Sequence, residues 1–348
     1  MPDTNRDMRK SKAPGRSQLL IWLALAFCCG VYADRGLALF GPVYDASIEE
    51  HAGSGDGELR FIRYAPRMRE AAASREMKEL QPFRYKVKAL VEGKLKAGRA
   101  SVISVYFRDL RNGHHFGIRE QEPFSADTLL KLPLMIAYLE WTDSTPLLLN
   151  RKIVYTGDHS SGQGERLGQP SPFKEGRSYK ISTLIHRMIA YNDDGAAAVL
   201  TANLPPGYLQ QVFKDISVNY DPARNDDMLA FKAYASFYRV LFNASYLSRE
   251  MSERALRFLS KTAFQDGIVS GVPPDVDVAA KYGERSVRDP AKDSGPEVMQ
   301  FHEFGIVYHP ARPYMIGVMV RGSDTRELAK TIRDISELVY GEVDRQAG

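Results

Sequence analysis

The spacing of apolar residues predicts the first elements of a domain that begins near residue 82. Apolar residues recur at helical intervals over 79–98, which predicts a helix with a solvated basic face. Residues 101–110 and 114–120 have the composition of strands, and Arg-Asn-Gly at 111–113 between them is typical of a hairpin. The domain is therefore expected to open with a helix and two paired strands.

The rest of the domain has a long helical middle and a second group of strands. Strand patterns return at 276–283, 302–309 and 312–322. A final helix follows, capped by Ser323 or Asp324. Two strands, a helical insert, three strands and a closing helix predict an α/β fold of the α+β type. We expect one domain over 82–343, with two lobes and a cleft between them.

Charge and histidine spacing argue against two classes of function, nucleic-acid binding and zinc binding. The net charge is +4 and the pI near 8.8, and acidic residues nearly balance basic ones. No basic footprint for nucleic acid stands out, so no nucleic-acid partner is expected. The histidines show no zinc-ligand spacing, and the sequence indicates no metal or organic cofactor.

The N-terminal 81 residues differ from the rest. Residues 1–17 are basic, 18–33 are apolar, and 34–81 have the composition of a stalk or linker with some helix. The apolar run predicts export, either as a cleaved signal peptide or as an uncleaved membrane anchor. Both cysteines, Cys28 and Cys29, lie in this run, so the exported part must be held together without a disulfide. The expected location is the cell envelope, and the oligomeric state is left open.

Thr128 and Lys131 are the first candidates for chemistry. On a helix they lie about 60° apart, so the amine of Lys131 is within reach of the Thr128 hydroxyl. A neutral lysine amine can take the hydroxyl proton and so create a nucleophile. Alone, however, a hydroxyl residue three positions before a lysine is a common chance occurrence.

Three segments in order give the chain a family resemblance. FSADTLLKLPLM (124–135) is similar to the Ser-x-x-Lys helix start of the penicillin-interacting serine hydrolases, and among them of the class A β-lactamase-like proteins. MIAYNDDGAAAVL (188–200) is similar to their Ser-Asp-Asn segment, and VAAKYGERS (278–286) to their Lys-Thr/Ser-Gly strand. The resemblance covers about 82–343 and implies a β-lactamase/transpeptidase-like fold with an antiparallel five-stranded sheet.

The resemblance also implies roles for individual residues. Thr128 would be the nucleophile and Lys131 the amine beside it, while Asn192, Asp193 and Asp194 would occupy the Ser-Asp-Asn positions. Lys281 would hold a substrate carboxylate. The remaining implied residues are Tyr282, Gly283 and Glu284 of the strand, with the backbone N–H groups of Thr128 and Glu284 forming the oxyanion hole.

Four departures from the family pattern put activity in doubt. Threonine replaces serine and adds a methyl group that crowds the attack path. Asn192 replaces the serine that passes a proton, and an amide cannot do this. Asp194 replaces an asparagine and is able to pair with Lys131, which would keep that lysine protonated. Tyr282 replaces a small hydroxyl residue, although its phenol partly substitutes for it.

A fifth departure concerns release of the product. The chain has no Glu-x-x-Leu-Asn between Asp194 and Phe231, where a class A β-lactamase carries its deacylating glutamate, and offers Asp221, Asp226 and Asp227 there instead. Slow deacylation is therefore expected. Two functions remain open: acyl transfer on a β-lactam or a peptidoglycan-type peptide through an acyl-enzyme, or a catalytically impaired binding or scaffolding role in the cell envelope.

Overall fold

The computed structural model describes residues 59–62, 80–125, 130–156, 173–220, 228–288 and 297–347. The chain divides into two units, and all of these residues belong to the second, Leu59–Gly348. The predicted segments 1–17 and 18–33, Thr128, and the three aspartates between 221 and 227 lie outside the described residues. Among the residues described, no helix combines the length and the apolar character that a membrane span requires.

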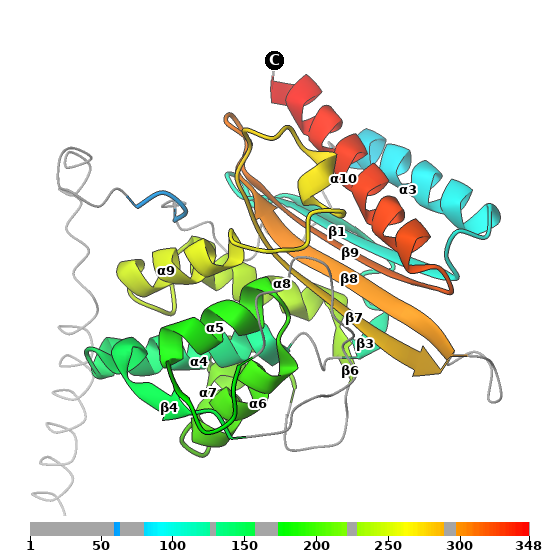
Figure 1. Cartoon of the computed structure of the whole chain (residues 1–348). Coiled ribbons are helices and arrows are strands. Elements are labelled where there is room, and N and C mark those ends of the chain that lie inside the picture. Colours follow the sequence, from blue (N-terminus) through cyan, green and yellow to red (C-terminus); the bar gives the residue numbers. More distant parts are fainter. Residues whose placement is uncertain are drawn as a thin grey trace, which may run out of the picture. The chain divides into compact units, whose positions relative to one another are not determined.

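A five-stranded antiparallel sheet forms the larger layer, as predicted. Its order is β2-β1-β9-β8-β7, so strands from both ends of the domain lie side by side (Figure 1). The strands are β1 (Val102–Asp109), β2 (His115–Ile118), β7 (Val278–Arg288), β8 (Glu297–Val307) and β9 (Tyr314–Gly322). The predicted hairpin of β1 and β2 and the late group of three strands are thereby confirmed.

Two long helices cover one face of this sheet (Figure 1). They are α3 (Gln81–Lys96) and α10 (Thr325–Ala347). Their apolar stripes pack with one side of the strands in a common hydrophobic cluster. Asp324 caps α10, because its Oδ1 accepts the backbone N–H groups of Arg326 and Glu327 at 2.9 and 3.3 Å.

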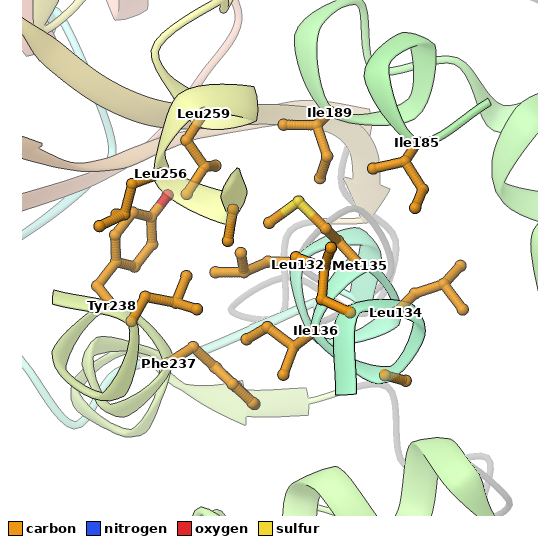
Figure 2. Close-up of a cluster of buried hydrophobic side chains, with 14 of the residues drawn as sticks. Leu132, Leu134, Met135, Ile136, Ile185, Ile189, Phe237, Tyr238, Leu256 and Leu259 are labelled. Atoms are coloured by element: carbon orange, nitrogen blue, oxygen red, sulfur yellow. The ribbon is translucent and has the colours of Figure 1, made fainter. Parts of the chain in front are cut away.

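The helical insert covers the opposite face. Its members are α4 (Lys131–Ser144), α5 (Ile181–Ala190), α6 (Asp194–Asn203), α7 (Tyr208–Asp215), α8 (Phe231–Phe242) and α9 (Arg249–Leu259), with the short 3-10 helix η4 (Leu148–Asn150). A second 3-10 helix, η5 (Val269–Gly271), packs instead against α10 on the other face. Helix α4 is apolar on all sides and is buried from Lys131 to Leu139. Figure 2 shows its side chains packed among those of α5, α8 and α9. The predicted all-helical lobe is therefore built around α4.

Two small antiparallel sheets in this lobe were not predicted. They are β3 (Pro123–Ser125) with β6 (Met228–Ala230), and β4 (Lys152–Val154) with β5 (Ser178–Lys180). Each strand is three residues long, too short for an alternating pattern to distinguish it from a loop.

A buried carboxyl group on β8 makes the free energy of unfolding depend on pH. Glu303 is fully buried on the α10 side of the sheet, where one oxygen accepts the Ile268 N–H at 2.7 Å. Burial raises its pKa from 4.5 to about 8, against the opposing effects of that N–H and of Lys281. Between these two values the folded chain holds a proton that the unfolded chain has lost, so stability must fall as pH rises through this window.

We therefore expect Glu303→Gln to flatten that dependence. The wild-type free energy of unfolding should fall on the order of 1 kcal/mol per pH unit between about pH 5 and 8, relative to the variant. Urea unfolding of the full chain at several pH values measures the difference, with Glu250→Gln, an exposed position on α9, as the control. Parallel curves for the wild type and Glu303→Gln would show that Glu303 is ionised in the folded chain.

Candidate functional site

Lys131 enters the site from the start of α4. It is the first residue of that helix and its side chain is buried. The next eight residues are apolar and fixed in the core of the helical lobe, so the helix start is held rigidly. A long cationic side chain is thus placed at the boundary between the lobe and the sheet.

The turn between α5 and α6 supplies the acceptors. Asn192 adopts a left-handed backbone conformation with φ of 57°, which asparagine tolerates better than most residues. Asp193 follows as the N-cap of α6, because its Oδ1 accepts the Ala196 N–H at 2.8 Å. The cap and the left-handed residue together turn the Asn192 side chain inward, where it is completely buried.

Lys281 comes from the sheet edge. It lies on β7, the outermost strand, opposite Phe304 of β8, and its side chain points to the helical-lobe face together with that of Ala279. Only 1% of it is exposed. Two lysines separated by 150 positions are therefore brought to one place by different elements.

Both ammonium groups bind the same amide oxygen. Asn192 Oδ1 accepts from Lys131 Nζ at 2.9 Å and from Lys281 Nζ at 2.7 Å. Because two cations face this atom, it must be the oxygen and not the nitrogen of the amide. The two lysines therefore meet at Asn192, and their expected convergence on the Thr128 hydroxyl stays a prediction because Thr128 lies outside the described residues. The amide Nδ2 is buried and has no partner among the described residues.

Lys131 is surrounded by oxygen atoms. Besides Asn192 Oδ1, its Nζ donates to the Asn192 carbonyl oxygen at 2.8 Å and forms an ion pair with Asp194 Oδ1. An ammonium group has three N–H donors, and these three acceptors all come from the described residues. They favour the charged form of the lysine, as the sequence suggested for the Asp194 pair. The Asp194 side chain is 39% exposed, so one end of this pair faces solvent.

The described charged groups at this site sum to a net positive charge. His302 lies on β8 opposite Gly283 and shares a sheet face with Lys281. Burial, together with the charges of Lys281 and Lys131, lowers the pKa of His302 to about 3, so its ring is neutral at physiological pH. Two buried cations, one partly exposed carboxylate and a neutral imidazole leave a local charge suited to an anionic ligand.

The other predicted residues lie along β7 or outside the described chain. Tyr282 is buried on the α10 side, its ring 4.8 Å from that of Phe264, with its hydroxyl 3.5 Å from the Tyr191 carbonyl oxygen. Gly283 and Glu284 continue the strand beyond Lys281. Since Thr128 lies outside the described residues, its role as nucleophile and the oxyanion hole remain predictions.

Two residues were missed by the sequence analysis. Arg187 holds Asp193 through two N–H groups at 3.1 and 2.9 Å and thereby supports the turn that carries Asn192. Its guanidinium group also lies 4.8 Å from the centroid of the Phe173 ring. The second missed residue is His302. If the predicted strands 276–283 and 302–309 are paired antiparallel, His302 lies close to Lys281.

A family model described as "Beta-lactamase enzyme family" matches residues 82–343. No curated protein matches the sequence. Solved structures are similar in fold. The structure of PBP-A is 18% identical in sequence with a TM-score of 0.62, and the match covers 76% of this chain and 97% of the PBP-A chain. A PBP-A variant solved as an acyl-enzyme complex with penicillin G has a TM-score of 0.63 at the same identity and coverage.

Solved β-lactamases are similar to a comparable degree. One from Chitinophaga pinensis is 19% identical, with a TM-score of 0.62 and coverage of 75% of this chain and 98% of that one. Another from Xanthomonas campestris pv. campestris is 18% identical, with a TM-score of 0.60 and coverage of 74% and 97%. At these identities the structures support the fold alone.

Proposed function

The chain belongs to the β-lactamase enzyme family, and from this premise we propose that it is an exported acyl-transfer protein that acts on β-lactams or peptidoglycan-type peptides. In this proposal the Thr128 hydroxyl attacks the substrate carbonyl carbon and an acyl-enzyme forms. The leaving amine takes up the proton that the hydroxyl gives up. Export through the apolar run 18–33 delivers the domain to the cell envelope.

The observation that carries the proposal is the shared contact of Lys131 and Lys281 with Asn192 Oδ1. Acyl transfer needs a group to receive the hydroxyl proton and a cation to hold an anionic substrate. A lysine at a helix start and a second lysine on the edge strand of a sheet supply these two groups in one cluster. The buried Asn192 Nδ2 supplies a further donor for a carbonyl or carboxylate oxygen.

A second candidate function is favoured by the ion pair of Lys131 with Asp194. A protonated lysine has no lone pair to accept the hydroxyl proton, and the carboxylate keeps it in that form. In this second proposal the domain binds its ligand without attacking it, as a binding or scaffolding module. The absence of any glutamate from the sequence between Asp194 and Phe231 also supports slow deacylation if an acyl-enzyme does form.

Labelling with a fluorescent penicillin separates the two functions. We expect the full chain to gain the mass of one opened β-lactam, and Thr128→Ala and Lys131→Ala to lose at least 90% of the labelling, because one removes the nucleophile and the other the amine. Intact-mass spectrometry gives the stoichiometry and gel fluorescence gives the rate.

The control is Lys330→Ala, which removes an exposed lysine on α10 and should label like the parent. An unlabelled parent that still binds penicillin reversibly in calorimetry would favour the binding module. Labelling that survives in Thr128→Ala would show that another side chain is the nucleophile.

A further inference from the structure

The β4–β5 hairpin of the helical lobe presents one cationic face. In its ladder Lys152 lies opposite Lys180, and Val154 lies opposite Ser178. Opposed and alternate residues share a face, so these four side chains lie on the same side of the hairpin, and all four are exposed. Two like charges directly opposite each other repel, and an anion between them would relieve that repulsion.

Further cations lie near this face, with one exposed carboxylate among them. Arg151, Lys174 and Arg177 are exposed, although strand alternation places Arg151 and Arg177 on the side of Ile153 and Tyr179, and Glu175 lies between Lys174 and Arg177 in the chain. None of the five cations forms an ion pair within the described residues. The basic residues on and just after helix α3 differ from those of the hairpin, because four of them form ion pairs with carboxylates. These pairs are Lys86–Glu342, Lys88–Glu92, Lys94–Asp334 and Arg99–Glu327. The hairpin charges are thus available to an external partner.

Exposed aliphatic side chains occur in the same stretch of chain as these charges. Val154 of this face is 47% exposed, and Leu147, five residues before Lys152 in the chain, is 74% exposed. Leu147 also holds a left-handed conformation with φ of 67°, which leucine rarely adopts. A cavity of about 430 Å³ lies beside β4 and is lined by residues 151–154 together with Trp141 of α4, Ile181 of α5 and Asn203 of α6, among others.

We propose that this hairpin face, with Leu147, docks on an anionic phospholipid bilayer. Cations at phosphate depth and short aliphatic side chains at the acyl boundary are the combination that peripheral membrane surfaces use. Aromatic side chains that would stack on nucleic-acid bases are not exposed on this face, since Tyr179 points to the core. The surface shares no residue with the lysine cluster.

Trp141 reports on this docking directly. The chain has two tryptophans, Trp22 in the apolar run and Trp141 at the cavity, so Trp22→Phe leaves Trp141 alone. We expect brominated lipids to quench Trp141 fluorescence of the full chain in vesicles that contain phosphatidylglycerol, and much less in phosphatidylcholine vesicles. High salt should remove the quenching, because screening weakens the attraction.

Variants of the face test its charges and its apolar residue separately. Each cation near an anionic surface strengthens binding about fivefold, so Lys152→Glu with Lys180→Glu should weaken docking about 100-fold or more. Lys96→Glu with Lys330→Glu, at exposed positions on α3 and α10, should leave it unchanged. Leu147→Asn, which suits the left-handed conformation, should reduce quenching without loss of stability.

Three results would overturn the proposal. One is equal quenching by brominated phosphatidylcholine and phosphatidylglycerol vesicles. Another is equal loss of quenching in the hairpin pair and in the control pair of variants. The third is binding of soluble polyphosphate at Trp141 with no docking on anionic vesicles, which would assign the face to a soluble polyanion.

Discussion

Changing Asn192 to serine and Asp194 to asparagine in one chain is expected to raise the rate of penicillin acylation about 100-fold. The double change removes the carboxylate that pairs with Lys131 and replaces an amide by a hydroxyl. The lysine can then lose its proton more readily. The serine can accept a hydrogen bond from Lys281 and pass its own proton on.

The two single variants show which of the two substitutions causes the rise in acylation rate. Asp194→Asn alone tests the charge on Lys131, and Asn192→Ser alone tests the proton path. Asp275→Asn, which removes an exposed carboxylate before β7, controls for the change in net charge. The measurement is the rate of fluorescent-penicillin labelling in the wild type, the two single variants, the double variant and the control. An unchanged rate in the double variant would mean that neither residue limits acylation, and attention would move to the methyl group of Thr128.

Long, periodic segments were the part of the fold that sequence could predict. Helix α10 and the three late strands have several turns or alternations each, and the hairpin of β1 and β2 has a turn with a recognised composition. The three-residue strands β3 to β6 have no period to detect. Their pairing depends on contacts between segments far apart in the chain, which a local pattern does not encode.

The site was predictable as a set of residues but not as a network. Motif order indicated that Lys131, Asn192 and Lys281 belong together. The orientation of the Asn192 amide, by contrast, follows from a left-handed backbone residue and from the Arg187 contact to Asp193. Neither has a sequence signal of its own. His302 was missed because a lone histidine in a strand is most often a core or surface residue.

Segment 59–62, which the sequence placed in a stalk, docks on the domain through α9. One carboxylate, that of Glu253, accepts three successive backbone N–H groups, from Arg60 at 3.0 Å, Phe61 at 2.7 Å and Ile62 at 3.0 Å. The Phe61 ring is buried, 5.2 Å from the ring of Tyr308. Glu253→Ala and Phe61→Ala are each expected to lower the free energy of unfolding by about 2 to 3 kcal/mol.

The double variant should lose little more than either single variant. Once Glu253 no longer holds the backbone, the segment leaves and Phe61 leaves with it, so the two contacts are lost together. Urea unfolding of the full chain measures all three losses. Arg257→Ala, an exposed neighbour whose guanidinium lies 3.5 Å from Glu253 Oε1, should cost less than about 0.5 kcal/mol. Additive losses would show instead that each residue stabilises the domain on its own, and an unchanged Glu253→Ala would show that the carboxylate does not hold the segment.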